Sequence, residues 1–120
     1  MRVKLQHVAH ARSGDKGNTA NIAVAAYAPE FYPYLKAQLT ADRVKAFYRG
    51  AITGAVQRYE IDGLAMLNFV AHGALGGGVS RSLSLDQYGK ALSAALLGYE
   101  LEIPDALHNL LRGMTRDEPQ

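Results

Sequence analysis

Cysteine and tryptophan are both absent from this chain of 120 residues. Without cysteine there can be no disulfide scaffold, no thiolate zinc site and no cysteine nucleophile, and the absence fits a reducing compartment. No apolar run approaches the roughly 20 residues that cross a bilayer. The basic start is not followed by a signal-peptide core, because Gln6, His7 and His10 interrupt it. We therefore expect a soluble, cytoplasmic protein without membrane contact.

Negative charge is scarce in the first half of the chain. Residues 1–58 contain nine Lys or Arg against three Asp or Glu, a net charge of +6, whereas residues 59–120 contain four against eight, a net charge of −4. Two halves that attract each other, within one fold or between subunits, would explain this asymmetry. A basic patch for an anionic ligand is the alternative. Nucleic acid is not expected, because Lys and Arg do not cluster with aromatic residues.

A hydrophobic content of 48% and this length suit one globular domain. Hydrophobic periodicity predicts strands over 3–7, 19–27, 52–61, 64–71 and 101–103, with helices beginning at Pro29, Thr40 and Ser84. Asp62-Gly63 is a two-residue hairpin signal between two of the strands. The order is an extra N-terminal strand plus βαββαβ, which is the ferredoxin-like order. We expect an α+β fold with an antiparallel sheet and helices on one face.

A polar segment that contains two glycines follows the first predicted strand, and we expect it to be a loop. It consists of Ala11, Arg12, Ser13, Gly14, Asp15, Lys16, Gly17 and Asn18. Glycines allow the backbone to turn several N–H groups toward one point, and two cations lie in the same segment. This combination suits a phosphate or carboxylate ligand. The alternative is a wide polar hairpin in which Asp15 pairs with Arg12 or Lys16.

A second glycine-rich segment precedes the predicted helix at Ser84. It includes Gly73, Gly76, Gly77, Gly78, Val79, Ser80 and Arg81. Such a loop at a helix N-terminus is a general anion site. It is not a Walker A motif, because Val79 stands where the lysine should be, and no βαβ unit makes it a dinucleotide site. The alternative is a flexible connection. We expect the two glycine-containing segments to meet in space.

Candidate acid–base groups are few. Asp15, Lys16 and His72 are the candidates for catalysis, and His10 and His72 lie at strand ends beside the two segments. His7 falls on an apolar face, where we expect a hydrogen-bonded core histidine. Asn68 lies among apolar residues and is expected to be hydrogen-bonded. Neither a metal site nor a cofactor is expected.

These segments, taken together and in order, are specific. They are Arg12 to Asn18, Asn21-Ile22, Arg58-Tyr59, Leu67-Asn68-Phe69, Leu75 to Ser80, and Asp86 with Gly89-Lys90. The chain resembles, from Val3 to Pro104, the small C-terminal domain of the acyclic terpene utilisation protein AtuA family. The resemblance implies a ferredoxin-like domain over residues 1–104, with residues 105–120 as a C-terminal helical extension and tail.

The same resemblance implies a role in the catabolism of acyclic terpenes as acyl-CoA thioesters, or in wider acyl-CoA metabolism. The family domain occurs fused behind a large AtuA domain or as a separate small protein. Ligand contacts are expected from Arg12, Ser13, Gly14, Lys16, Gly17, Asn18, Asn68, Gly76, Gly77, Gly78, Ser80 and Arg81. The large domain is missing from this chain, so a 120-residue subunit is expected to supply part of a site.

Three functional hypotheses follow, and the sequence leaves open whether the chain is an enzyme. The first is an accessory or half-site subunit that binds an anionic acyl-CoA-type ligand, as a homo-oligomer or with a larger AtuA-like subunit. The second is a small stand-alone hydratase or hydrolase. The third is a structural oligomerisation module without a ligand.

Overall fold

Four antiparallel strands form the main sheet of the computed structural model, which describes residues 1–16, 19–73 and 92–113. Their order across the sheet is β2-β3-β5-β4. The strands are β2 (Ala9–Lys16), β3 (Thr19–Ala26), β4 (Val56–Ile61) and β5 (Met66–His72). A separate antiparallel pair is formed by β1 (Arg2–Lys4) and β6 (Glu100–Glu102). The first and last strands are therefore neighbours.

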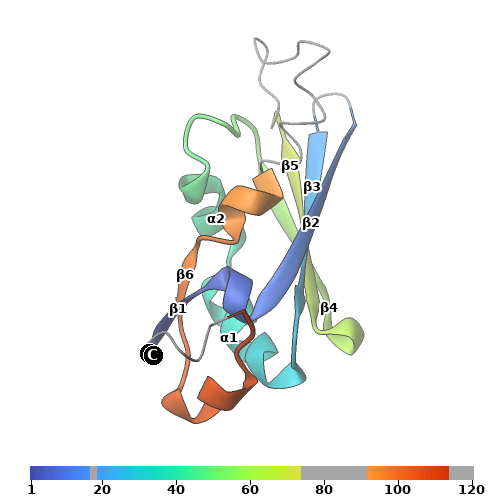
Figure 1. Ribbon diagram of the computed structural model, residues 1–120. Helices are drawn as coiled ribbons and strands as arrows, with labels where there is room; N and C mark the ends of the chain where they lie inside the picture. The colour runs from blue at the N-terminus through green and yellow to red at the C-terminus, as the bar shows by residue number, and fades with distance from the viewer. Residues whose placement is uncertain (17–18, 74–91, 114–120) are drawn as a thin grey trace.

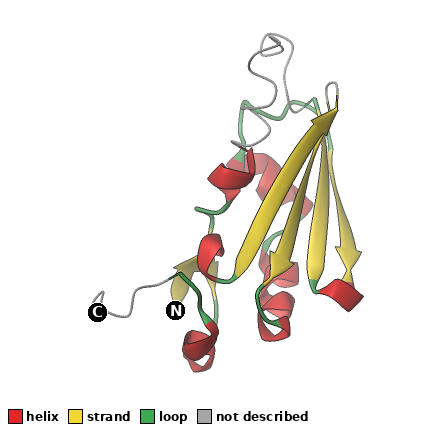
Figure 2. Ribbon diagram, turned by 45° about the vertical axis from the view of Figure 1, so that its right-hand side comes forward, coloured by secondary structure: helices red, strands yellow, loops and turns green. Residues whose placement is uncertain are grey.

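The helices lie with the β1–β6 pair on one side of the main sheet, as Figures 1 and 2 show. They are α1 (Tyr32–Gln38), α2 (Ala41–Phe47) and a helical segment at 92–96. Short 3-10 helices are η1 (Leu5–His7), η2 (Pro29–Phe31), η3 (Asp62–Leu64) and η4 (Asp105–Leu110). Thr40 caps α2 as predicted, because its hydroxyl accepts from the backbone N–H of Arg43 at 3.2 Å.

The core lies between this face of the sheet and the helices. Alternate residues of β3 and β5, among them Ile22, Leu67 and Phe69, are fully buried against Phe31 and Leu35. Period-2 alternation in the strands and helical spacing in α1 thus bring the apolar residues into one layer. The predicted α+β class, with an antiparallel sheet and helices on one face, is confirmed.

The predicted loop at 11–18 is wrong for residues 11–16, which belong to β2. This strand pairs with β3 from Ala9–Ala26 to Lys16–Thr19 without interruption. Its alternating residues are small on the core side, with Ala9 and Ala11, so the segment lacks the branched apolar residues that usually signal a strand. The polar character of the segment reflects a strand with one open side.

The predicted strand at 3–7 is also interrupted. It breaks at η1, where the backbone N–H of Leu5 donates to Tyr99 O at 2.7 Å. The strand predicted from Ile52 begins only at Val56. The turn at Asp62-Gly63 is wider than a two-residue hairpin, because η3 ends at Ala65 with φ at +50°.

The C-terminal helix predicted after Pro104 is present only as η4, a 3-10 helix. The predicted helix start at Ser84 lies outside the described residues. Within the described ranges, the helices are too short or too polar to cross a membrane.

Candidate functional site

The side of the main sheet that faces away from the helices, here called the open face, carries most of the predicted site residues that the structure describes (Figure 1). Burial and register assign fourteen described residues to it. These are His10, Arg12 and Gly14 on β2, Thr19, Asn21, Ala23 and Ala25 on β3, Met66, Asn68, Val70 and His72 on β5, and Gln57, Tyr59 and Ile61 on β4. No Asp or Glu occurs among these fourteen residues, and Arg12 is exposed.

Strand register aligns these residues in transverse rows. Arg12 pairs with Ala23, Ala23 with Asn68, and Asn68 with Tyr59, so one row crosses all four strands. The next row contains Gly14, Asn21, Val70 and Gln57. In these rows and the next one, Gly14, Ala23 and Ala25 are small, whereas their β2–β3 partners Asn21, Arg12 and His10 are longer. The open face is therefore lowest at these three small residues, and the residues on β4 and β5 are larger.

Amide side chains connect the rows. Asn21 Nδ2 donates to Asn68 Oδ1 at 3.3 Å, which confirms that Asn68 is hydrogen-bonded, although it is half-buried on the open face and not in the core. A Cβ on Gly14 would lie 3.3 Å from Asn21 Oδ1. Glycine at this position thus leaves room for the Asn21 amide.

Gln57 holds His72 at the end of β5. Gln57 Oε1 lies 3.2 Å from His72 Nε2 and 3.4 Å from the Tyr59 hydroxyl. An amide oxygen can only accept, so the imidazole donates from Nε2. This arrangement orients the exposed His72 ring, and in the neutral form of the ring Nδ1 is then the acceptor.

The predicted site residues fall into three groups. Arg12, Gly14, Asn68 and His72 lie on the open face, whereas Ser13 pairs with Ile22 on the core-facing side of β2. The backbones of Asp15 and Lys16 end β2, but their side chains lie outside what the structure describes. Also outside the described residues are Gly17, Asn18, Gly76, Gly77, Gly78, Ser80 and Arg81.

The described strand ends favour the predicted meeting of the two glycine-containing segments. Lys16 pairs with Thr19, and Thr19 pairs with His72, so the β2–β3 connection and the exit from β5 lie at the same end of the sheet. Gly73 follows directly and is bonded to the segment before β4, where Thr53 Oγ1 donates to Gly73 O at 3.1 Å. That the two segments meet stays a prediction, because it depends on the position of Gly77, which lies outside the described residues.

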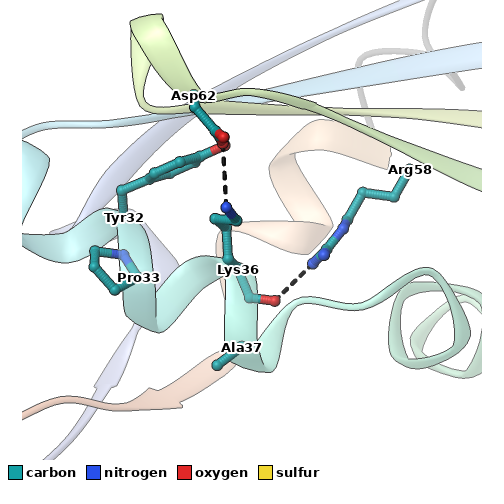
Figure 3. Close-up of a pocket in the computed structure, with 6 residues that line it drawn as sticks. All are labelled: Tyr32, Pro33, Lys36, Ala37, Arg58 and Asp62. Carbon is teal, nitrogen blue, oxygen red and sulfur yellow. Dashed lines mark hydrogen bonds and ion pairs between the residues drawn. The ribbon is translucent and has the colours of Figure 1, made fainter.

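A second polar cluster lines a pocket of about 500 Å³ between α1 and the end of β4 (Figure 3). The Tyr32 hydroxyl lies 2.7 Å from Asp62 Oδ1, and Lys36 Nζ lies 3.2 Å from the same oxygen. Burial, and then the contact with Asp62, raise the pKa of Tyr32 to about 12. The hydrogen bonds from Tyr32 and Lys36 lower the pKa of Asp62.

Arg58 lines the same pocket, and its guanidinium is bonded to other groups of the chain. It donates to Lys36 O at 2.7 Å and Leu39 O at 3.0 Å, and it pairs with Glu60 at 2.6 Å. Each cation of the pocket therefore has an internal carboxylate partner, and the cluster joins α1 to β4. Sequence analysis missed it, since Tyr32 and Asp62 are far apart in the chain and neither has a local motif.

Two further histidines, His7 and His10, lie in separate surroundings. His7 Nδ1 lies 2.8 Å from Arg112 O, and the His10 ring lies 5.8 Å from the Tyr27 ring. His7 is half-buried and held to the chain backbone, so it is hydrogen-bonded as expected but not enclosed in the core. Over the described ranges, no three His, Asp or Glu side chains group in a way that could hold a metal ion.

Comparison with known proteins gives one result. The family model of the AtuA ferredoxin-like domain matches residues 3–102, which is most of the chain. No curated protein and no solved structure matches the chain.

Proposed function

The chain belongs to the AtuA ferredoxin-like domain family, and from that premise we propose that it is an accessory or half-site subunit that binds an anionic ligand of the acyl-CoA type. The observation that carries the proposal is the open face. Its described residues include the exposed Arg12, several amides and imidazoles, and no carboxylate. Charge-assisted hydrogen bonds from such groups favour phosphate.

The comparison between Arg12 and Arg58 supports this assignment. Arg58 is bonded to two carbonyl oxygens and to Glu60, whereas Arg12 has no hydrogen-bond or ion-pair partner among the described residues. A guanidinium without an internal carboxylate can bind an external anion without first breaking an ion pair. Lys16, at the end of the same strand, remains a predicted second cation of the site.

An open face that the described residues leave uncovered suits a site that is completed by another chain. Among the described residues, the helices cover the core-facing side of the sheet (Figure 2). A larger AtuA-like subunit, or a second copy of this chain, would close the ligand against the open face. Participation in acyclic terpene or related acyl-CoA catabolism is the part of the proposal that rests on the family resemblance alone.

The test is calorimetric titration of CoA, an acyl-CoA and inorganic phosphate into the wild type, Arg12→Ala, Lys16→Ala and Lys45→Ala. Lys45 is an exposed cation on α2, on the other side of the sheet, and serves as the control. A lost charge-assisted hydrogen bond of roughly 1.5–3 kcal/mol predicts CoA binding weakened about tenfold or more in the first two variants only. Equal affinities in all four proteins, or no binding by the wild type, would exclude the anion site.

A stand-alone hydratase or hydrolase is a second candidate, favoured by the hydrogen bond that orients His72. Its Nδ1 is an acceptor at the end of the sheet where Lys16 lies. Turnover of an acyl-CoA by the isolated chain, abolished in His72→Gln, would select this function. Binding without turnover leaves the accessory role.

A further inference from the structure

On the open face, a small residue lies between two longer polar residues, and this spacing leaves room for a flat ring. Arg12 on β2 and Asn68 on β5 flank Ala23 in one transverse row. Neighbouring strands are about 4.8 Å apart, so the backbones of Arg12 and Asn68 are roughly 10 Å apart. Only the methyl group of Ala23 stands between them, with Ala25 and Gly14 beside it in the adjoining rows.

Two side-chain amides border this floor, Asn68 from the neighbouring strand β5 and Asn21 from β3 itself. Asn21 and Asn68 use one donor and one acceptor in their mutual hydrogen bond. The amide oxygen and second amino hydrogen of Asn21, and both amino hydrogens of Asn68, remain for a ligand. A side-chain amide recognises adenine through paired donor and acceptor groups, and the edge of a ring lying flat on Ala23 would face Asn68.

The residues at the two ends of the row offer an aromatic surface and a cation. Tyr59, which is 50% exposed, stands beyond Asn68 and offers an aromatic surface. Arg12, at the other end, has a planar guanidinium that can stack on a ring or bind phosphate through two parallel hydrogen bonds.

We propose that the row Arg12–Ala23–Asn68–Tyr59 binds the base of a purine nucleotide, with Ala23 as its floor and Arg12 on its phosphate. This inference rests on the proposed function and makes it more specific. It assigns the specific contacts to the nucleotide part of the ligand and not to its acyl part.

A single nucleotide fits the open face better than a single strand of nucleic acid. Single-strand binding requires a track of cations and successive aromatic platforms. The described residues of the open face include one arginine and one tyrosine, at opposite ends of the same row. One arginine and one tyrosine suit a ligand that has a single base and a phosphate group.

The test compares ADP with pyrophosphate, which has the phosphate groups but lacks the base. Both are titrated calorimetrically into the wild type, Ala23→Leu and Asn68→Ala. Ala46→Leu, an exposed position on α2, is the matched control for the added bulk. Far-ultraviolet circular dichroism checks that each variant is folded.

The contacts of the base with Ala23 and Asn68 are lost in pyrophosphate, so ADP should bind the wild type about tenfold tighter than pyrophosphate. Ala23→Leu should remove that advantage while pyrophosphate binding and Ala46→Leu stay unchanged, and Asn68→Ala should reduce it. Equal affinity for the two ligands, or an unchanged advantage in both site variants, would overturn the nucleotide inference and leave the anion site in place.

Absence of binding by both ligands would overturn the nucleotide inference, and the separate titration of CoA then decides whether the proposed function stands. A short oligoadenylate that binds much more tightly than ADP, with an affinity that rises with its length, would overturn the single-nucleotide site in favour of nucleic acid.

Discussion

At the scale of single residues, one hydroxyl group connects two distant parts of the chain. The Tyr32 side chain is 8% exposed, and its hydroxyl lies 2.7 Å from Asp62 Oδ1 and 3.1 Å from Met66 O. It thereby fixes α1 to the turn between β4 and β5. Lys36 contributes a second contact to the same carboxylate.

Removal of this hydroxyl in Tyr32→Phe should lower the free energy of unfolding by about 1 kcal/mol at neutral pH, the usual value of one hydrogen bond. The difference in the free energy of unfolding between the wild type and Tyr32→Phe should become smaller at alkaline pH. The ordinary pKa of 10.0 applies in the unfolded chain and about 12 in the folded one, so between these values only the unfolded chain loses its proton. The wild type therefore loses this stabilisation as pH rises through the window.

Urea unfolding of the wild type and Tyr32→Phe, below pH 10 and inside the window, measures both effects. Tyr59→Phe is the control, because Tyr59 is 50% exposed and its hydroxyl lies 3.4 Å from Gln57 Oε1, a long and exposed hydrogen bond. A gap between the two proteins that stays constant across the window would contradict the assignment.

Several residues of the open face could be named from the sequence, but the side of the sheet on which each residue lies could not be predicted. Arg12, Gly14 and Asn68 were identified from composition, glycine content and family resemblance, and they lie together on the open face. Ser13 was grouped with them but belongs to the other side of β2. Successive side chains alternate between the two faces of a strand, but a predicted loop has no such alternation. The loop prediction therefore could not place Ser13 and Arg12 on opposite faces.

At the scale of elements, the exit from β5 depends on the close approach of two backbones. Gly54 N donates to His72 O at 2.9 Å, and His72 N donates to Ala55 O at 2.9 Å. A Cβ on Gly54 would lie 2.5 Å from His72 O, and one on Gly73 would lie 2.5 Å from Thr53 Oγ1. Glycines at both positions permit this approach, which places His72 and Gly73 at the end of β5.

Gly54→Ala should destabilise the fold by about 1–3 kcal/mol, because an added methyl group must displace backbone atoms. Gly63→Ala is the matched control, since a Cβ there meets nothing within 4 Å and its backbone needs no positive φ. Thermal unfolding of both variants gives the comparison. Equal melting temperatures for the two variants would contradict this prediction, because they would mean that the backbone near Gly54 shifts at little cost.

At the scale of the whole molecule, the central and edge strands should differ in local stability. Both β3 and β5 have neighbours on either side, whereas β2 and β4 are the edges of the described sheet. We expect backbone amides of β3 and β5 to exchange slowest with deuterium, and the outward amides of β2 and β4 to exchange much faster. Mass-spectrometric hydrogen exchange checks this, and slowest exchange in β2 would contradict the sheet order.

The fold class could be predicted because it depends on local periodicity, but the strand partners could not. The sequence predicts a short strand after the last helix, and β6 is present. Nothing local indicates that β6 pairs with β1 and stays apart from the main sheet. That choice depends on η1, which turns the chain between Leu5 and His7, and 3-10 turns of this length have no strong sequence signal.

The pairing of the first and last strands has a consequence for biosynthesis. Val3 pairs with Leu101, and both are buried in the finished fold. A ribosome delivers the N-terminal residues first, so the hairpin of β2 and β3 can form while the partner of β1 does not yet exist. Val3 and Leu5 then remain available to chaperones until the last strand emerges. Because the β1–β6 pairing joins residues about a hundred positions apart, we expect it to be among the last contacts to form.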